Sequence, residues 1–370
     1  MKLKSVIMLI AFSAATMASG LSCSDSSSVQ PSTPEASAYR KRVNEIHENI
    51  YKYFYDSKAK LYYETYPRSA EDNAHSYLWP LCGLIQAVNE QEVLNPNGAY
   101  MAPVVEAINQ YHSTEGPAPG YNSYVVKEWD SDKYYDDNQW IGIAYMDAYN
   151  RTGNTVYLNK ADEIYTFMMT GYDEKSGGGI YWRENDYSSK NTCSNGPGIL
   201  VALQLYKVKK EQKYLDAAIK LYEWVNNYLL SPEGVYYDNV KIPSLEIDKA
   251  QYTYNTGTML QSNVLLYEIT KEEKYHAEAR RLANAANSRF YQASRFPDDY
   301  WFNAVMLRGF IALYNIDKDK DLLKNFISAA EYVWEKERDE NNLVGKKTAK
   351  GLIDQAAMME VYARLEQLGN

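Results

Sequence analysis

The stretch "NGPGILVALQLY", residues 195–206, is followed after a short polar turn by "QKYLDAAIKLYEWV", residues 212–225. The first segment is apolar around its whole circumference, which is typical of a buried helix, and the second has one apolar stripe, which is typical of a covering helix. Segments similar to the second begin at Thr155, Glu273 and Asp321. Their starts lie roughly 50 to 60 residues apart, a period that predicts a repeat of paired helices.

Six apolar segments alternate with six more polar ones over residues 38–370. The apolar segments are "HSYLWPLCGLIQAV", "DNQWIGIAYMDAY", "NGPGILVALQLY", "NTGTMLQSNVLLY", "WFNAVMLRGFIALY" and "GLIDQAAMMEVYARL". Most are preceded by a long linker with a short β-like aromatic run, such as "GYDEKSGGGIYWRE", and are followed by a tight turn. We therefore predict an all-α, single-domain (α/α)6 toroid of six inner and six outer helices. The polar starts of the inner helices would converge on one funnel mouth.

The N-terminus has the pattern of an export signal. Two lysines precede the apolar run "SVIMLIAFSAATMASG", which is short for a membrane span. We predict a lipoprotein-type signal peptide over residues 1–22, lipidation of Cys23 and a flexible tether over residues 23–37. The protein would then be exported and anchored on the periplasmic side or at the cell surface, touching the membrane only through its lipid. Gly20 departs from the usual leucine, so simple secretion with cleavage near Ser19 is the alternative.

Composition narrows the range of partners. The net charge is −9 and no basic block follows the extreme N-terminus, which argues against nucleic acid and against an anionic membrane surface. The chain has 36 Tyr and 7 Trp but only 8 Phe, which suits either a sugar-binding groove or half-buried helix packing. Cys82 and Cys193 have no metal-type spacing and are expected to be free thiols. We predict no cofactor and no metal.

The segment "YYDDNQWIG", residues 134–142, places Asp136 and Asp137 side by side where an inner helix begins. One interpretation is helix capping, since aspartate accepts hydrogen bonds from free N–H groups in the first turn. The other is a catalytic carboxylate pair, because a retaining glycosidase needs a nucleophile and an acid/base about 5 to 5.5 Å apart. In that case Asp136 is the expected nucleophile. Asp137, shielded by Trp140 on the same helix face, is the expected acid/base.

A second pair, Asp298 and Asp299 in "RFPDDYWFNA", also precedes an inner helix. Its neighbouring proline suits a helix start, so capping explains it equally well. The residues alone do not rank the two pairs. Other chemistries have less support, because the chain contains no HExxH metal motif and no GxSxG nucleophile motif.

Four ordered motifs resemble family 76 of the glycoside hydrolases, the bacterial endo-α-1,6-mannanases. They are "YYDDNQWIGIAYMDAYNRTGN", "GGGIYWRE", "KNTCSNGPGILVALQLY" and "YTYNTGTMLQSNVLLY". The resemblance extends from about Tyr39 to the C-terminus and implies an (α/α)6 barrel and a retaining mechanism. It also implies that Asp136 and Asp137 are the nucleophile and the acid/base, in preference to the second pair. Thr256 stands where the family usually has glutamine, which affects one polar contact expected near the active centre.

The predicted function is therefore a retaining, endo-acting hydrolase of α-1,6-mannosidic linkages that acts as a monomer on α-mannan. The residues expected to bind substrate are Trp140, Tyr135, Trp182, Asn195, Tyr252, Asn255 and Asp299. Tyr181 and Trp182 are expected to reach the funnel on the "GGG" loop, whereas Trp140 could instead be an ordinary core residue. The alternatives are an exo-acting α-mannosidase, an unsaturated-glycuronyl hydrolase with the same fold, and a noncatalytic glycan-binding lipoprotein.

Overall fold

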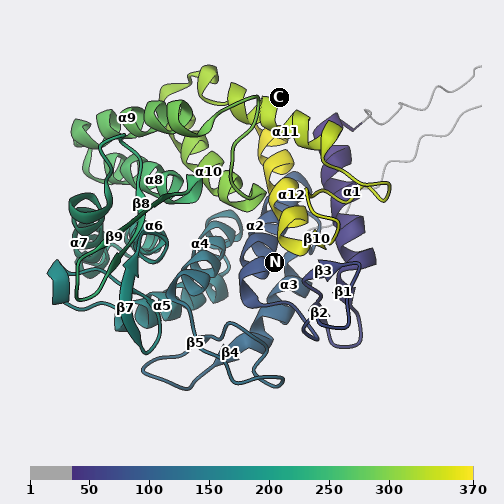
Figure 1. Ribbon diagram of the computed structural model, residues 1–370, viewed down its shortest axis with the longest axis horizontal. Coiled ribbons are helices and arrows are strands. Elements are labelled where there is room, and N and C mark those ends of the chain that lie inside the picture. Colours follow the sequence, from purple (N-terminus) through teal and green to yellow (C-terminus); the bar gives the residue numbers. More distant parts are fainter. Residues whose placement is uncertain (1–35, 370) are drawn as a thin grey trace, which may run out of the picture. The chain divides into compact units, whose positions relative to one another are not determined.

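Six long helices form a closed inner ring in the computed structural model, which describes residues 36–369 (Figure 1). In chain order they are α2 (Leu78–Leu94), α4 (Tyr135–Thr152), α6 (Thr192–Lys209), α8 (Thr253–Thr270), α10 (Tyr300–Asp317) and α12 (Leu352–Gln367). Each contacts the next, and α12 contacts α2, which closes the ring. Both faces of these helices are buried, as their continuous apolar sequences predicted.

Six outer helices cover this ring (Figure 1). They are α1 (Ala38–Tyr53), α3 (Met101–Ile108), α5 (Thr155–Thr170), α7 (Gln212–Leu229), α9 (Glu273–Phe290) and α11 (Lys324–Lys336). In α7 the buried residues recur every three or four positions, from Tyr214 to Val225, and form one stripe against the ring. The predicted all-α (α/α)6 toroid is confirmed. One helix differs from the prediction, because the segment expected from Asp321 opens as a 3-10 turn and α11 begins at Lys324.

Tight turns join most inner helices to the outer helices that follow. The residue after each of α4, α6, α8 and α10 adopts the left-handed conformation, with φ of 69° at Gly153, 58° at Lys210, 62° at Lys271 and 56° at Lys318. Its N–H bonds a carbonyl four residues back and so satisfies one free acceptor of the helix end. These turns reverse the chain within a few residues, so the longer connections all lie at the other ends of the helices.

Those longer connections carry short antiparallel strands. They are β1 (Tyr55–Asp56), β2 (Leu61–Tyr62), β3 (Thr65–Tyr66), β4 (His112–Ser113), β5 (Gly120–Tyr121), β6 (Tyr181–Arg183), β7 (Asp186–Asn191), β8 (Tyr237–Lys241), β9 (Ile247–Gln251) and β10 (Lys350–Gly351). β6 to β9 form one four-stranded sheet in chain order. β10 pairs with β3, which joins the last connection to the first. The predicted β-like aromatic segments are thus confirmed, and they surround the mouth of the ring.

Close packing and buried charge hold the ring together. A Cβ atom on Gly257 of α8 would lie 2.4 Å from the Cα of Met306, so α8 and α10 approach too closely for any side chain there. In the ring interior, the Arg308 guanidinium donates to both oxygens of Glu360 at 2.6 and 2.7 Å. Asp147 accepts hydrogen bonds from glutamines of the two neighbouring helices. Because these groups are paired, the ring can enclose polar side chains.

The predicted signal peptide, Cys23 and all but the end of the tether lie outside the described residues. The first helix begins at Ala38, with the Ser37 hydroxyl accepting a hydrogen bond from the backbone N–H of Arg40. Within residues 36–369, no helix is long and apolar enough to cross a membrane.

Candidate active site

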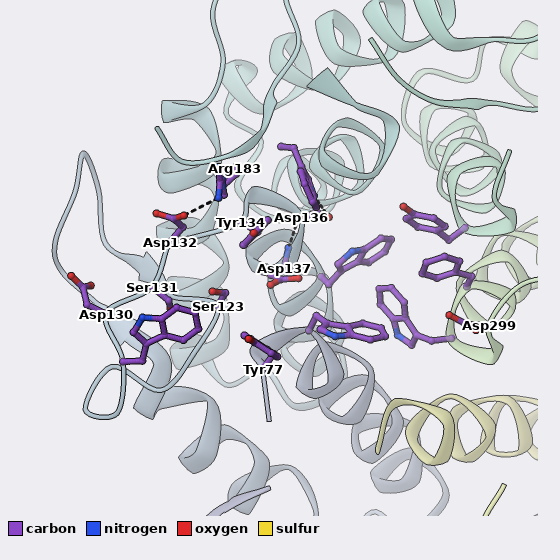
Figure 2. A pocket seen from close by; sticks show the side chains of 17 residues that line it. Tyr77, Ser123, Asp130, Ser131, Asp132, Tyr134, Asp136, Asp137, Arg183 and Asp299 are labelled. Carbon is purple, nitrogen blue, oxygen red and sulfur yellow. Dashed lines mark hydrogen bonds and ion pairs between the residues drawn. The ribbon is translucent and has the colours of Figure 1, made fainter. Parts of the chain in front are cut away.

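A cavity of about 770 Å³ opens at the N-terminal ends of the inner helices (Figure 2). Its lining combines nine aromatic residues with five aspartates, two serines and one arginine. These are Tyr77, Trp79, Trp129, Tyr134, Trp140, Trp182, Tyr254, Trp301 and Phe302, with Asp130, Asp132, Asp136, Asp137, Asp299, Ser123, Ser131 and Arg183. Aromatic faces with interspersed acceptors are suited to sugar rings, which present both C–H surfaces and hydroxyl groups.

The helix register decides which side chains face this cavity. The second residue of an inner helix lines it in four of the six cases, namely Trp79, Asp136, Tyr254 and Trp301. The second residue of α6 is Cys193, whose thiol contacts Asp136 directly behind the wall. Equivalent positions of a pseudo-sixfold ring point to the same axis, so this one position contributes four of the seventeen lining residues.

Asp136 and Asp137 are the second and third residues of α4 and lie in its first turn. The helix cap is Tyr134, whose side chain makes no capping bond. Oδ1 of Asp136 accepts from the backbone N–H of Asp137 at 3.1 Å, and its Oδ2 accepts from the Trp182 indole N–H at 3.1 Å. Among residues 36–369 no hydrogen-bond donor contacts the Asp137 carboxyl group. Capping therefore does not account for Asp137.

The two carboxyl groups differ in how readily they lose a proton. Burial raises the pKa of Asp136 to about 6, against the opposing effect of hydrogen bonds from Cys193 and Trp182. Burial and the neighbouring Asp136 charge raise the pKa of Asp137 well above its ordinary value, with no hydrogen bond to oppose them. Between these two pKa values, Asp136 is the carboxylate and Asp137 keeps its proton. One group can then attack while the other donates a proton.

Three predicted substrate-binding residues line the cavity. Trp140 packs its ring edge-on against Trp301 at 5.1 Å and presents the remainder to the cavity. Trp182 is 39% exposed and stands over Asp136. Asp299 lies across the cavity from the Asp136–Asp137 pair (Figure 2). The structure thus brings these three together with both aspartates.

Tyr135 and Tyr181 point elsewhere, which corrects their expected placement. Tyr135 is the first residue of α4, and its ring stacks on Phe167 of α5 at 4.9 Å. Tyr181 is buried, and its hydroxyl donates to Asp173 at 3.0 Å. Alternation along β6 explains the second case, because Trp182 and its neighbour Tyr181 must face opposite sides of the strand.

Asn195, expected to bind substrate, does not line the cavity either. It is the fourth residue of α6 and fully buried, and its amide bonds both the N–H and the C=O of Ile180, at 2.7 and 3.0 Å. Asn138, the fourth residue of α4, bonds Tyr121 in the same way. Thr256, the fourth residue of α8, accepts from the Tyr236 N–H at 3.2 Å. Fourth positions therefore anchor the preceding connection, and the expected effect of Thr256 on an active-centre contact is replaced by a structural role.

Tyr252 and Asn255 are the two remaining predicted residues that do not line the cavity. Tyr252 precedes α8 and packs against Tyr254 and Phe302, with ring centroids 6.0 and 5.8 Å away, so it supports the wall from behind. Asn255 is fully buried. Asn255 directly follows the lining residue Tyr254, and the rotation of about 100° per helical residue turns it away from the cavity. Tyr252 lies two residues before Tyr254, outside the helix.

Several lining residues were missed by the sequence analysis. They are Tyr77, Trp79, Ser123, Trp129, Asp130, Ser131, Asp132, Tyr134, Arg183, Tyr254, Trp301 and Phe302. Three of them, Trp79, Tyr254 and Trp301, share the register of Asp136, so aligning the six helix starts would have identified them. The loop residues 129–132 carry no such periodic signal.

The two cysteines within residues 36–369, Cys82 and Cys193, are free and buried, as expected. In the same part of the chain no group of three or more His, Cys, Asp or Glu side chains is placed to hold a metal ion. The functional groups on which the described site can rely are the carboxylate pair and the aromatic side chains of the wall.

Paired carboxylates in an aromatic cavity of an (α/α)6 toroid define a carbohydrate-active protein. The family model of glycosyl hydrolase family 76 matches residues 38–330. A family 76 mannosidase from Bacteroides thetaiotaomicron has a similar structure, with a TM-score of 0.83 and 27% identity, over 90% of this chain and 100% of that one. A second α-mannanase of the family from that organism gives a TM-score of 0.84 and 25% identity, over 90% and 98%.

A curated relative is the mannan endo-1,6-α-mannosidase DCW1 of Saccharomyces cerevisiae, 30% identical over 186 residues. That match covers 46% of this chain and 41% of the yeast protein, so it spans less than half the length of that relative. Because the family model covers most of the described residues, the chain belongs to glycosyl hydrolase family 76. The resemblance noted in the sequence is thereby confirmed.

Proposed function

We propose that the protein is a retaining, endo-acting glycoside hydrolase that cleaves α-1,6-mannosidic linkages in mannan backbones. The observation that carries the proposal is the pair of adjacent carboxyl groups, Asp136 and Asp137, on the wall of an aromatic cavity. Family membership and the names of the similar proteins, an α-mannanase and a mannan endo-1,6-α-mannosidase, support the substrate class.

In the first step the Asp136 carboxylate attacks the anomeric carbon of the mannosyl unit. The bond from that carbon to the glycosidic oxygen breaks, and the proton of Asp137 passes to this oxygen, so the leaving chain departs as an alcohol. The product is a mannosyl ester of Asp136. The higher pKa of Asp137 supports this division, because the acid must still hold its proton when the nucleophile is ionised.

In the second step a water molecule attacks the same anomeric carbon and gives its proton to Asp137, now a carboxylate. The ester bond to Asp136 breaks, which regenerates both groups in their starting protonation states. Two displacements at one carbon retain the α configuration. Proton NMR of a fresh digest should therefore show the α anomer before mutarotation begins, and the β anomer appearing first would refute the proposed pair of roles.

Digestion of linear α-1,6-mannan tests the function itself. A ladder of oligosaccharides is expected, because the cavity is lined on several sides by aromatic residues that can hold consecutive sugar units. Mannose as the sole product would instead indicate an exo-acting α-mannosidase. Turnover of an unsaturated glycuronide would indicate a glycuronyl hydrolase, and binding of mannan without cleavage would indicate a noncatalytic glycan-binding protein.

We also propose that the protein is exported, anchored through a lipid on Cys23, and monomeric. The apolar N-terminal run followed by "LSC" and a Ser/Pro-rich segment supports the first two points. A Cys23→Ala variant should move from the membrane fraction to the soluble fraction of the expressing cells. Size-exclusion chromatography with light scattering of the chain from residue 37 onward tests the oligomeric state.

A further inference from the structure

Asp136 and Asp137 share a helix turn and are both half-buried on the cavity wall, so something else must distinguish them. What differs is the supply of hydrogen-bond donors. Asp136 receives the Trp182 indole N–H on Oδ2 and the backbone N–H of Asp137 on Oδ1, both at 3.1 Å. Donors stabilise the ionised form of a carboxyl group, and a group without donors stays protonated to higher pH. Among the described residues, two side chains from other elements donate to Asp136, the Cys193 thiol on α6 and the Trp182 indole on β6, and Trp182 is the one that donates an N–H.

Trp182 is held in place by the strand on which it lies. Its neighbour Arg183 forms an antiparallel bridge with Tyr134, two residues before Asp136. Beside this bridge the Glu184 N–H donates to the Lys133 carbonyl at 2.9 Å. The Tyr134 ring meets the Trp182 ring edge-on at 5.0 Å and 67°. This short connection joins β6 to the start of α4, so the position of the indole relative to Asp136 is set locally.

We infer that Trp182, besides lining the cavity, is a positioning residue whose indole N–H selects Asp136 as the carboxylate that stays ionised and attacks. The inference rests on the proposed retaining mechanism, because it assigns the nucleophile within that mechanism. It extends the sequence prediction, in which Trp182 was only a surface for sugar binding. The residue would act on the chemical step through Asp136 and on binding through its ring face.

Other groups around Asp136 also influence its charge. They are Asp137 on α4, Cys193 on α6, Cys82 on α2, Tyr254 on α8, Arg183 on β6 and, across the cavity, Asp299 before α10. Arg183 is already paired with Asp132 and Asp186, at 3.0 and 2.9 Å. Cys193 is a weaker donor than an indole N–H, because a thiol hydrogen bonds weakly. Removal of the Trp182 N–H is therefore expected to raise the pKa of Asp136 further.

The test compares Trp182→Phe with the wild type, since phenylalanine keeps an aromatic face and removes the N–H. We expect the acidic limb of the kcat/KM profile to move upward by about half a pH unit or more, which is about a threefold loss of ionised Asp136 on that limb. Trp129→Phe is the matched control, because Trp129 lines the same cavity without contacting Asp136, and its acidic limb should stay in place even if KM rises.

A second measurement does not depend on turnover. Carbon NMR of protein labelled at the aspartate side-chain carboxyl carbons follows the Asp136 titration directly, assigned with Asp136→Asn, and the same upward shift is expected in Trp182→Phe. An unchanged Asp136 titration, or a rise in KM alone, would overturn the inference and leave Trp182 as a binding surface. If the titration shifts but the wild type releases no product from mannan, the proposed function fails while the positioning contact stands.

Discussion

Asp136–Asp137 and Asp298–Asp299 occupy similar places in the sequence, each beside the start of an inner helix. Their side chains nevertheless lie in different environments. The first pair lies inside the first turn of α4, and both side chains line the cavity. The second pair precedes α10. Asp298 accepts from the Thr253 N–H at 2.5 Å, and Asp299 occupies the cap position, lines the cavity, and makes no capping bond.

The difference comes from where the helix starts. In α4 the aspartates are the second and third helical residues, and in α10 those positions belong to Trp301 and Phe302. A shift of three residues rotates a side chain by about 300° and moves it along the axis by about 4.5 Å. Two identical dipeptides thus become a pair of candidate catalytic groups in one helix, and a backbone acceptor with a single cavity residue in the other.

The largest difference should appear in catalysis. We expect Asp136→Asn and Asp137→Asn each to lower kcat/KM on linear α-1,6-mannan by about 10³-fold or more, because each removes a group that acts on the reacting bond. Asp298→Asn should keep most of the activity. The measurement is the release of reducing ends. Near-normal activity of either first-pair variant would show that the dyad is wrongly assigned.

An aryl glycoside of α-1,6-mannobiose should separate the two roles within the first pair. A good leaving group needs little protonation, so bond cleavage by Asp137→Asn should recover on this substrate, with a burst of released phenol. Asp136→Asn should remain inactive on both substrates because it lacks the nucleophile. Recovery of Asp136→Asn instead would exchange the assignments.

The pH dependence provides the next largest effect. Asp136 must be ionised to attack, so kcat/KM should fall about tenfold per pH unit below its pKa of about 6. Asp137 must be protonated, so activity should fall again above its raised pKa. Asp298→Asn should leave both limbs in place. A flat profile between pH 5 and 7 would contradict the assignment of the lower limb to Asp136.

Substitutions in the two pairs should change the free energy of unfolding in opposite directions. The raised pKa of Asp136 means that the folded state holds its proton more tightly than the unfolded state does. The resulting stabilisation of the folded state is fully present below the unfolded-state pKa of about 4. It is lost as the pH rises through about 6, the pKa of Asp136 in the folded state. Asp136→Asn should therefore raise the free energy of unfolding above pH 6, by about 1 to 2 kcal/mol.

Asp298→Ala should have the opposite effect, because it leaves the Thr253 N–H without its acceptor. We expect a loss of about 1 to 2 kcal/mol at pH 7. Chemical denaturation of the two variants and the wild type at pH 5 and pH 7.5 checks both signs. If Asp298→Ala is as stable as the wild type, the bond to Thr253 contributes nothing measurable.

Asp299→Asn should cause the smallest change. Asp299 is exposed and makes no capping bond, so the free energy of unfolding should stay within about 0.5 kcal/mol of the wild type. KM should rise modestly, because one acceptor on the far wall of the cavity is altered while Asp136 and Asp137 are intact. A loss of kcat as large as that of Asp137→Asn would mean that Asp299 takes part in the chemistry.

Periodicity was sufficient to predict the toroid, because an inner helix must be apolar all round and an outer helix needs only a stripe. The predicted contacts of individual side chains were less accurate. Trp140, Trp182 and Asp299 line the cavity as expected, whereas Tyr135, Asn195, Tyr252 and Asn255 do not. Tyr135 and Asn255 are adjacent in sequence to cavity residues, and the rotation of one helical residue directs them away from the cavity. Tyr252 precedes α8, and Asn195 holds the backbone of Ile180.

The sequence by itself determined the repeat, the order of inner and outer helices, and the presence of two acidic pairs at helix starts. These are local properties, carried by hydrophobic period and by turn residues. The tertiary structure alone decided that Trp182 reaches Asp136 across 46 residues of sequence, and that Arg308 pairs with Glu360 inside the ring. Such contacts depend on how separate segments meet around the axis. The bridge between β6 and the start of α4 fixes the first contact and the closure of the ring fixes the second, because no periodic signal in one segment specifies its distance from another.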